Sequence, residues 1–164
     1  MKNRDLQLNR VNNILDFFKK GKSLEGISVL DKSEKLFKIM GTPVSIIGDK
    51  KWGYYRYAGG LQYGYTKDHI DEVGIVFDGN KRTKFPVKVD LLEENYITNK
   101  TSICSLIKLL SYSKIKWRSW DENSTSAFSI RTEGDVLILF HLDEETLEKI
   151  VYLGHYDLKT YRGT

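Results

Sequence analysis

The chain has 164 residues, enough for one domain with a sizeable core, and its 40% hydrophobic and 29% charged content argues against a disordered chain. With 26 basic and 22 acidic residues, the formal net charge of +4 is mild for a dedicated nucleic-acid binder. No stretch approaches the ~18 apolar residues of a membrane helix, and the first ten residues lack the apolar run of a signal peptide. Cys104 is the single cysteine, which fits a reducing compartment. We therefore expect a cytoplasmic protein.

The first half of the sequence predicts two helices followed by strands. Apolar residues recur at helical spacing over residues 6–20. A second helix over residues 31–40 begins with Asp31 and Glu34 at the spacing of a capping box, and Pro43 ends it. Strands follow at residues 44–47, 52–57, 61–65 and 73–77, with a hairpin turn at residues 58–60.

The second half repeats this kind of pattern. Apolar spacing predicts a third helix over residues 100–110, and residues 85–89 are extended, with Pro86 restricting them to an edge or a loop. Further strands are predicted at residues 115–120, 127–132, 136–142 and 150–153, with a hairpin turn at residues 133–135. The sequence thus predicts an α+β fold, an antiparallel sheet with helices packed on one face.

The two halves align with each other. Residues 36–40 align with residues 106–110, and the turn at Gly59-Gly60-Leu61 aligns with Gly134-Asp135-Val136. Ile70 and Val73 align with Leu147 and Ile150, and both pairs are three residues apart. A tryptophan follows the helix in each half: Trp52 in the first half, and Trp117 and Trp120 in the second. We therefore predict a single domain over residues 1–164, with an N-terminal helix at 6–20 and two tandem α-β-β-β pseudo-repeats at 27–78 and 98–154.

No catalytic, metal or cofactor site is predicted. The three histidines, His69, His141 and His155, are far apart in sequence, and none has a partner at metal-ligand spacing. His69 lies in a polar turn and is expected to face solvent. Cys104 lies among apolar residues in the first turn of a helix, where we expect a small buried thiol. The chain is therefore expected not to be an enzyme.

The aromatic residues are the candidate binding residues. In the strand at 52–57, alternation places Trp52 and Tyr54 on one face, expected in the core, and Tyr55 and Tyr57 on the other, expected to be exposed. In the second half Trp117 and Trp120 cannot share a face of a regular strand, so one of them is expected to be exposed. Exposed Tyr, Trp and Arg side chains are typical binding anchors, although each aromatic alone is also suited to the core. The predicted partner-binding residues are Tyr55, Arg56, Tyr57, Trp117 and Trp120.

One sequence pattern extends over the first half. It consists of a leucine-containing helix that ends in Gly-x-Pro (residues 36–43), then Trp52 with Tyr54, then a strand at residues 61–65. This pattern is similar to that of the outer-membrane assembly lipoprotein family and of the tandem-repeat β-lactamase inhibitor proteins, which implies a helix-plus-antiparallel-sheet fold that binds other proteins. In the second half Ser111-Tyr112-Ser113 replaces the Gly-x-Pro turn. Residues 39–77 also resemble small bacterial immunity proteins encoded beside secreted toxins. The resemblance, with the expected cytoplasmic location, implies an immunity protein that neutralises a toxin by stoichiometric binding.

Two other functions remain open. A small nucleic-acid-binding module is suggested by the basic cluster of Lys81, Arg82, Lys84 and Lys88 together with aromatics that could stack on bases, although a solvated loop also explains the cluster. A toxin or nuclease domain would need polar residues that only the fold brings together.

Overall fold

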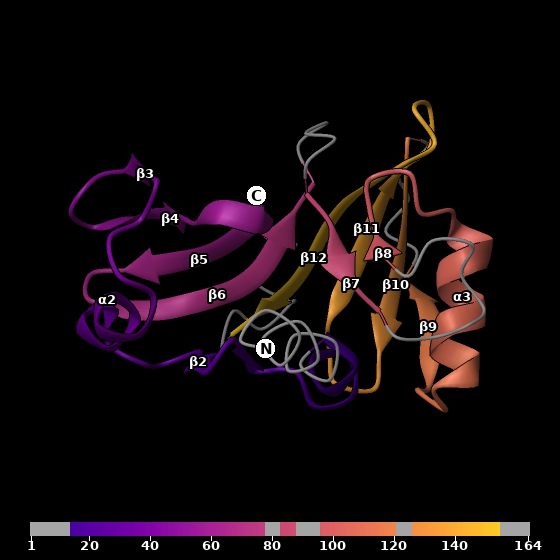
Figure 1. Cartoon of the computed structure of the whole chain (residues 1–164), viewed down its shortest axis with the longest axis horizontal. Coiled ribbons are helices and arrows are strands. Elements are labelled where there is room, and N and C mark those ends of the chain that lie inside the picture. The colour runs from indigo at the N-terminus through magenta and orange to yellow at the C-terminus, as the bar shows by residue number, and fades with distance from the viewer. Residues whose placement is uncertain (1–13, 78–82, 88–95, 121–125, 155–164) are drawn as a thin grey trace, which may run out of the picture.

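A computed structural model describes residues 14–77, 83–87, 96–120 and 126–154, and confirms the α+β class (Figure 1). Residues 14–20 are helical, and two further helices are α2 (Ser33–Met40) and α3 (Ile103–Tyr112). The main sheet is antiparallel throughout and has eight strands: β3 (Ser45–Gly48), β4 (Trp52–Arg56), β5 (Leu61–Thr66), β6 (His69–Val76), β9 (Trp117–Trp120), β10 (Ala127–Thr132), β11 (Leu137–His141) and β12 (Thr146–Leu153). Two small pairs complete the described part, β1 (Ser23–Leu24) with β2 (Ile27–Ser28), and β7 (Phe85–Pro86) with β8 (Tyr96–Ile97).

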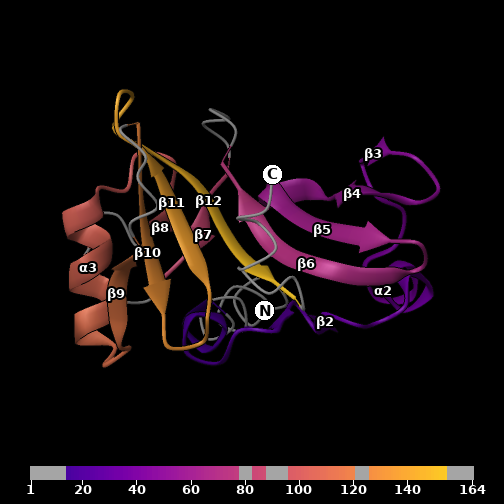
Figure 2. The same ribbon diagram turned by 180° about the vertical axis from the view of Figure 1, so that it is seen from behind.

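The strand order of the main sheet is symmetric about its centre. The strands lie in the order β3-β4-β5-β6-β12-β11-β10-β9, so each half is a four-stranded meander preceded by a helix, α2 in the first half and α3 in the second. The last strands of the two halves, β6 and β12, pair antiparallel and join the meanders into one sheet (Figure 2). Each unit therefore has one strand more than the predicted α-β-β-β pattern.

The register repeats as well as the order. The β5–β6 ladder shifts between Gly64 and Tyr65, and the β11–β12 ladder shifts at the equivalent place, between Leu139 and Phe140. Beyond these bulges Tyr65 lies opposite Ile70, as Phe140 lies opposite Leu147. The tryptophans do not correspond in this way. Trp52 lies in β4, where the equivalent residue of β10 is Ala127, whereas Trp117 and Trp120 lie in β9, the counterpart of β3.

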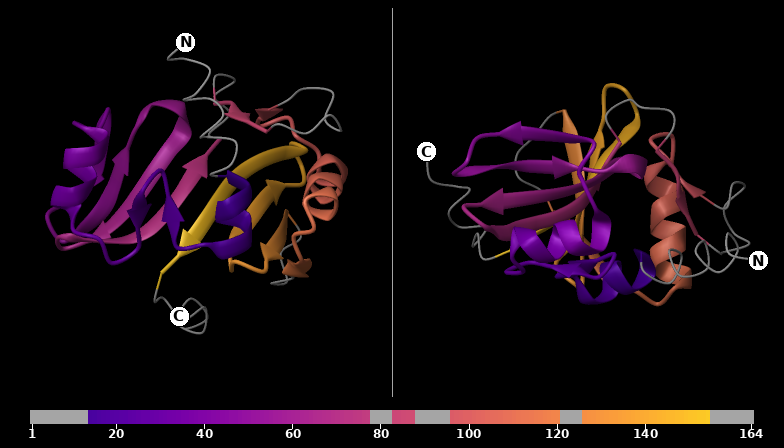
Figure 3. Two further views of the ribbon diagram at one scale, coloured as in Figure 1. Left: turned by 60° about the horizontal axis from the view of Figure 1, so that its bottom comes forward. Right: turned by 60° about the vertical axis from the view of Figure 1, so that its left-hand side comes forward.

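The core lies between one face of the sheet and the helices. Both halves contribute to one cluster, which includes Ile14, Phe17 and Phe18 from the first helical segment, Leu36 from α2, Leu106, Leu109 and Leu110 from α3, and Leu61, Tyr63, Val73, Ile75, Ile130, Ile138, Phe140 and Ile150 from the strands. The sheet twists so strongly that the strands of its two halves run in clearly different directions (Figure 3). We call this covered side the inner face and the opposite side the outer face.

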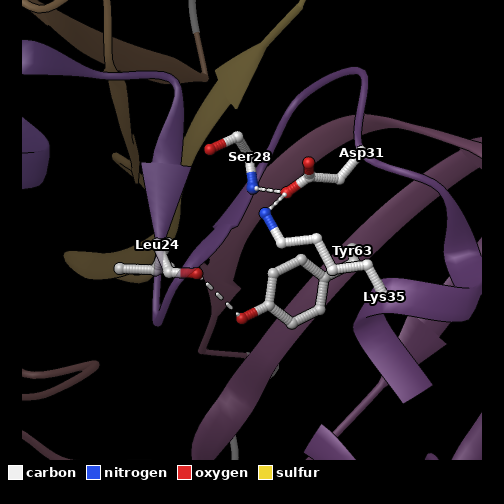
Figure 4. Close-up of polar contacts among 5 residues, drawn as sticks. All are labelled: Leu24, Ser28, Asp31, Lys35 and Tyr63. Atoms are coloured by element: carbon white, nitrogen blue, oxygen red, sulfur yellow. Dashed lines mark hydrogen bonds and ion pairs between the residues drawn. The ribbon is translucent and has the colours of Figure 1, made fainter. Parts of the chain in front are cut away.

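The segment between the first helical residues and α2 is held by polar contacts on the inner face (Figure 4). The buried Tyr63 hydroxyl of β5 donates to Leu24 O at 3.2 Å. The Asp31 carboxylate accepts from Ser28 N and from Lys35 Nζ, each at 2.7 Å. The predicted capping box is therefore wrong, because Lys32 is the N-cap of α2 and makes no side-chain cap bond, while Asp31 closes the turn before the helix instead.

Asp31 is expected to make stability depend on acid. Burial opposes its ionisation, but the hydrogen bonds from Lys35 and Ser28 N–H and the Lys35 charge outweigh this, so the pKa of Asp31 is lowered. A carboxyl whose folded pKa lies below its ordinary value of about 3.9 stabilises the fold above that pH and loses this contribution as pH falls through the lowered pKa. We expect Asp31→Asn to cost about 1 kcal/mol at pH 7 and less at pH 3, below the ordinary carboxyl pKa, measured by urea unfolding at both pH values. An equal cost at both would contradict it.

Gly74 is expected to be required at the centre of the sheet. It lies opposite Val151 in the β6–β12 pair, and a Cβ at this position would lie 2.5 Å from Ile150 O and 3.1 Å from Val151 Cα. Because backbone atoms of a central strand cannot move aside cheaply, we expect Gly74→Ala to lower the free energy of unfolding by about 1–3 kcal/mol. The control is Thr146→Ala at the partly buried start of β12. Gly134→Ala is unsuitable as a control, because a Cβ at Gly134 would also collide with backbone atoms. Equal stability of the two variants would refute the steric account.

Candidate functional site

Two of the predicted binding residues, Tyr55 and Tyr57, face the core, so the expectation that they are exposed is wrong. Tyr55 stacks on Tyr65 with ring centroids 4.3 Å apart and meets the edge of Phe37 at 5.0 Å. The Tyr57 hydroxyl donates to Gly41 O at 3.0 Å, and burial raises the pKa of Tyr57. Both rings therefore attach α2 and the segment after it to the sheet, and neither offers a free surface to a partner.

Trp52 and Tyr54 occupy the opposite side of β4 from the one predicted. Trp52 is 60% exposed, and Tyr54 lies on the outer face, where it pairs with Gly64 across the β4–β5 ladder. Alternation separates residues 52 and 54 from 55 and 57 correctly, but it does not identify which set faces the helices. Gly53 lies on the same side as Tyr55, and a Cβ at this position would collide with Ile47 O and with the Tyr65 ring.

Arg56 lies on the outer face and begins a polar chain across four strands. Its Nε donates to Gln62 Oε1 at 3.0 Å, and Gln62 Nε2 donates in turn to Glu72 Oε1 at 3.3 Å. Lys149 Nζ of β12 lies 2.6 Å from the same Glu72 oxygen and 5.7 Å from the centre of the Tyr54 ring. Gln62 and Glu72 are buried, so this chain is a structural network that joins the two halves of the sheet.

The two tryptophans of β9 lie on opposite faces, as predicted. Trp117 pairs with Thr132 and is 37% exposed. Trp120 lies on the outer face between two guanidinium groups, with Arg131 Cζ 4.6 Å and Arg118 Cζ 5.2 Å from its ring centre. The structure brings Trp120 and Arg56 to one face but leaves Trp117 on the other, so the predicted residues do not form one site.

Cys104 and the histidines are the remaining candidate residues. Cys104 is exposed, so the expectation of a buried thiol is wrong, because α3 turns Leu106, Leu109 and Leu110 inward instead. His69 is exposed as expected, with Nδ1 at 2.7 Å from Asp68 Oδ1. No group of His, Cys, Asp or Glu among the described residues is arranged to hold a metal ion. His155 and three members of the basic cluster, Lys81, Arg82 and Lys88, lie outside the described residues.

The outer face has a shallow groove beside Trp52 that contains two carboxylates. The groove has a volume of about 200 Å³ and is lined by Trp52, Gly53, Tyr54, Tyr65, Thr66, Asp71, Glu72 and Leu153. Asp71 accepts a hydrogen bond from the Thr66 hydroxyl, and Glu72 is bound by Lys149 and Gln62. Both carboxylates are thus held by neighbouring side chains, which is the arrangement of structural groups.

A surface that the sequence did not predict lies at the β3 edge of the sheet. Exposed large apolar residues concentrate there, and we call them the β3 edge surface: Phe37, Ile39, Val44, Ile46, Ile47 and Trp52. Val44 is 77% exposed, Ile46 58% and Ile47 46%. Ile46 lies on the side of Tyr55 and Ile47 on the side of Tyr54, so the β3 edge surface extends around the end of the sheet, and exposed apolar clusters of this kind often mark binding sites. One available signal was the pair Ile46-Ile47, because consecutive apolar residues in a strand must place one side chain on each face.

Comparison with known proteins identifies no relative. No family model, no curated protein and no solved structure matches this chain. Among the helices that the structure describes, none has the length and apolar content to cross a membrane.

The ion pair between Glu72 and Lys149 is expected to stabilise the sheet. Lys149→Met would leave the Glu72 carboxylate buried without its cation, and we expect the free energy of unfolding to fall by about 2–4 kcal/mol. Adding Glu72→Gln removes the uncompensated charge, so the double variant is expected to lose less than the two single losses combined. Chemical unfolding of the four proteins measures this coupling. Additive losses would indicate that the two side chains do not interact.

Proposed function

We propose that this protein is a non-catalytic protein-binding protein that forms a stoichiometric complex through the β3 edge surface. The exposure of Val44, Ile46, Ile47 and Trp52 at one edge of the sheet supports this proposal. Burial of apolar surface is the main favourable contribution to protein association, and exposed aliphatic and aromatic side chains are the residues that provide it.

The specific form that we propose is an immunity protein that neutralises a bacterial toxin. The support is the resemblance of residues 39–77 to such proteins, together with an architecture whose exposed apolar surface suits binding more than chemistry. A cytoplasmic location, which we also propose, would place the protein where a toxin that enters the cell must be intercepted.

A nucleic-acid-binding role is a second candidate, favoured by one observation. Trp120 with Arg118 and Arg131 combines a ring and two cations on the outer face, as in surfaces that stack bases. Part of this charge is already balanced, however, because Arg131 lies 2.9 Å from Asp135. In the β3 edge surface Val44, Ile46, Ile47 and Trp52 each leave between 46% and 77% of the residue exposed, so this surface supports protein binding more strongly.

The test is capture of the partner by tagged protein from an extract of the source organism at moderate salt. We expect one protein in a one-to-one complex, and we expect Ile46→Lys to weaken it at least about tenfold, because a lysine ammonium would be buried in the interface without a partner. Tyr112→Lys is the matched control, since Tyr112 is 64% exposed at the far end of α3 and lies outside the β3 edge surface.

Neutralisation requires a separate measurement. The captured protein is expressed alone and together with this chain, and we expect growth arrest in the first case and rescue in the second. Rescue that fails while the complex forms would leave protein binding and overturn the immunity role. Capture of nucleic acid in place of protein, lost in high salt, would overturn the protein-binding proposal.

A further inference from the structure

In the part of the chain that the structure describes, β3 is the last strand at one end of the main sheet, so one of its backbone edges has no neighbouring strand. At the β3–β4 turn Asp49 N donates to Trp52 O at 3.0 Å, and hydrogen-bonded pairs alternate along an antiparallel ladder. Ser45 and Ile47 are therefore bonded to β4, whereas the N–H and C=O groups of Ile46 point away from the sheet. An extended chain that lay beside β3 would meet these groups at the spacing of a sheet ladder.

The opposite edge of the same sheet is protected and β3 is not. Edge strands commonly carry charged side chains that prevent another strand from adding. In β9 the residue equivalent to Ser45 is Arg118, which stacks with Trp120. β3 reads Ser-Ile-Ile-Gly, is uncharged, and is exposed along its whole length. The β9 edge therefore has a charged side chain that opposes the addition of another strand, and the β3 edge has none within the strand.

The charges beside β3 indicate what kind of strand would bind. Lys38 in the last turn of α2 and Lys50 and Lys51 in the β3–β4 turn are exposed, and none of them forms an ion pair with a described carboxylate. The Asp49 carboxylate in the same turn accepts the N–H groups of Lys51 and Trp52. The apolar edge thus has a basic rim, which favours an acidic partner.

We propose that the β3 edge receives an extended apolar segment of an acidic protein, which adds to the sheet as a ninth strand. This inference rests on the proposed function and names the mode of binding and the chemistry of the partner. Main-chain hydrogen bonds to Ile46 provide the pairing, the β3 edge surface contacts the alternate side chains of the segment, and the lysines bind its flanking carboxylates. A second copy of this chain fits less well, because its net charge of +4 is less complementary to the lysines than that of an acidic protein.

Two matched proline variants test the backbone contact. Ile46→Pro removes an outward N–H that the isolated sheet does not use, and Ser119→Pro does the same at the equivalent position of β9. We expect Ile46→Pro to abolish binding of the captured partner and Ser119→Pro to leave it unchanged, with thermal unfolding as the check that both variants fold. Equal binding by both variants would overturn the edge proposal and leave protein binding intact. Failure of the wild-type chain to capture any protein would count against the proposed function itself.

A measurement on the wild-type chain avoids reliance on variants. The probe is a synthetic peptide of alternating Val and Thr flanked by two Glu at each end, and the control peptide has Lys in place of Glu. Amide hydrogen exchange followed by NMR is expected to show slowed exchange of Ile46 N–H with the acidic peptide and binding at least about tenfold weaker with the basic one. Protection elsewhere, or equal binding of the two peptides, would overturn the proposal. So would a dimer of the chain alone that Ile46→Pro dissociates.

Discussion

The pairing of β6 with β12 is the contact on which the rest of the molecule depends. It joins two four-stranded meanders into one sheet, and it places Ile75 opposite Ile150 at the centre of the core. Either meander alone would have too little covered surface to bury its apolar side chains. The N-terminal segment then spans this junction, since Phe18 O accepts from Gly134 N of the second half while Leu24 O accepts from Tyr63 of the first.

The order of helices and strands could be predicted because it depends on the spacing of apolar and turn-forming residues close together in the sequence. Helix 33–40, strand β10 and the turns at residues 58–60 and 133–135 each follow from residue spacing within a few positions. The faces could not be predicted in the same way, because alternation along β4 is equally consistent with Tyr55 or Tyr54 in the core. The choice is made by contacts remote in sequence, such as that of Phe37 with Tyr55. Cys104 illustrates the same limit, because the rotation of α3 on the sheet exposes it.

The candidate site was harder to predict than the fold for a related reason. A short uncharged strand such as β3 looks like a core strand in sequence, and only its place at the end of the strand order reveals it as an edge. Tyr55 and Tyr57, which the sequence predicts as binding residues, instead pack against α2 and the segment after it. Residues that look like binding anchors and residues that are free to bind are thus different sets in this molecule.

The ion pair of Glu72 with Lys149 also bears on how the chain is built. The repeated register makes these two positions equivalent, related by the two-fold axis that passes through the pair of Gly74 and Val151. Two identical half-length chains associated in this way would have to place two glutamates or two lysines at the same point, where like charges would repel. Covalent fusion of the halves removes that constraint, since each position can then mutate independently. Opposite charges at symmetric sites are therefore a property that a single chain can acquire and a homodimer of half-chains cannot.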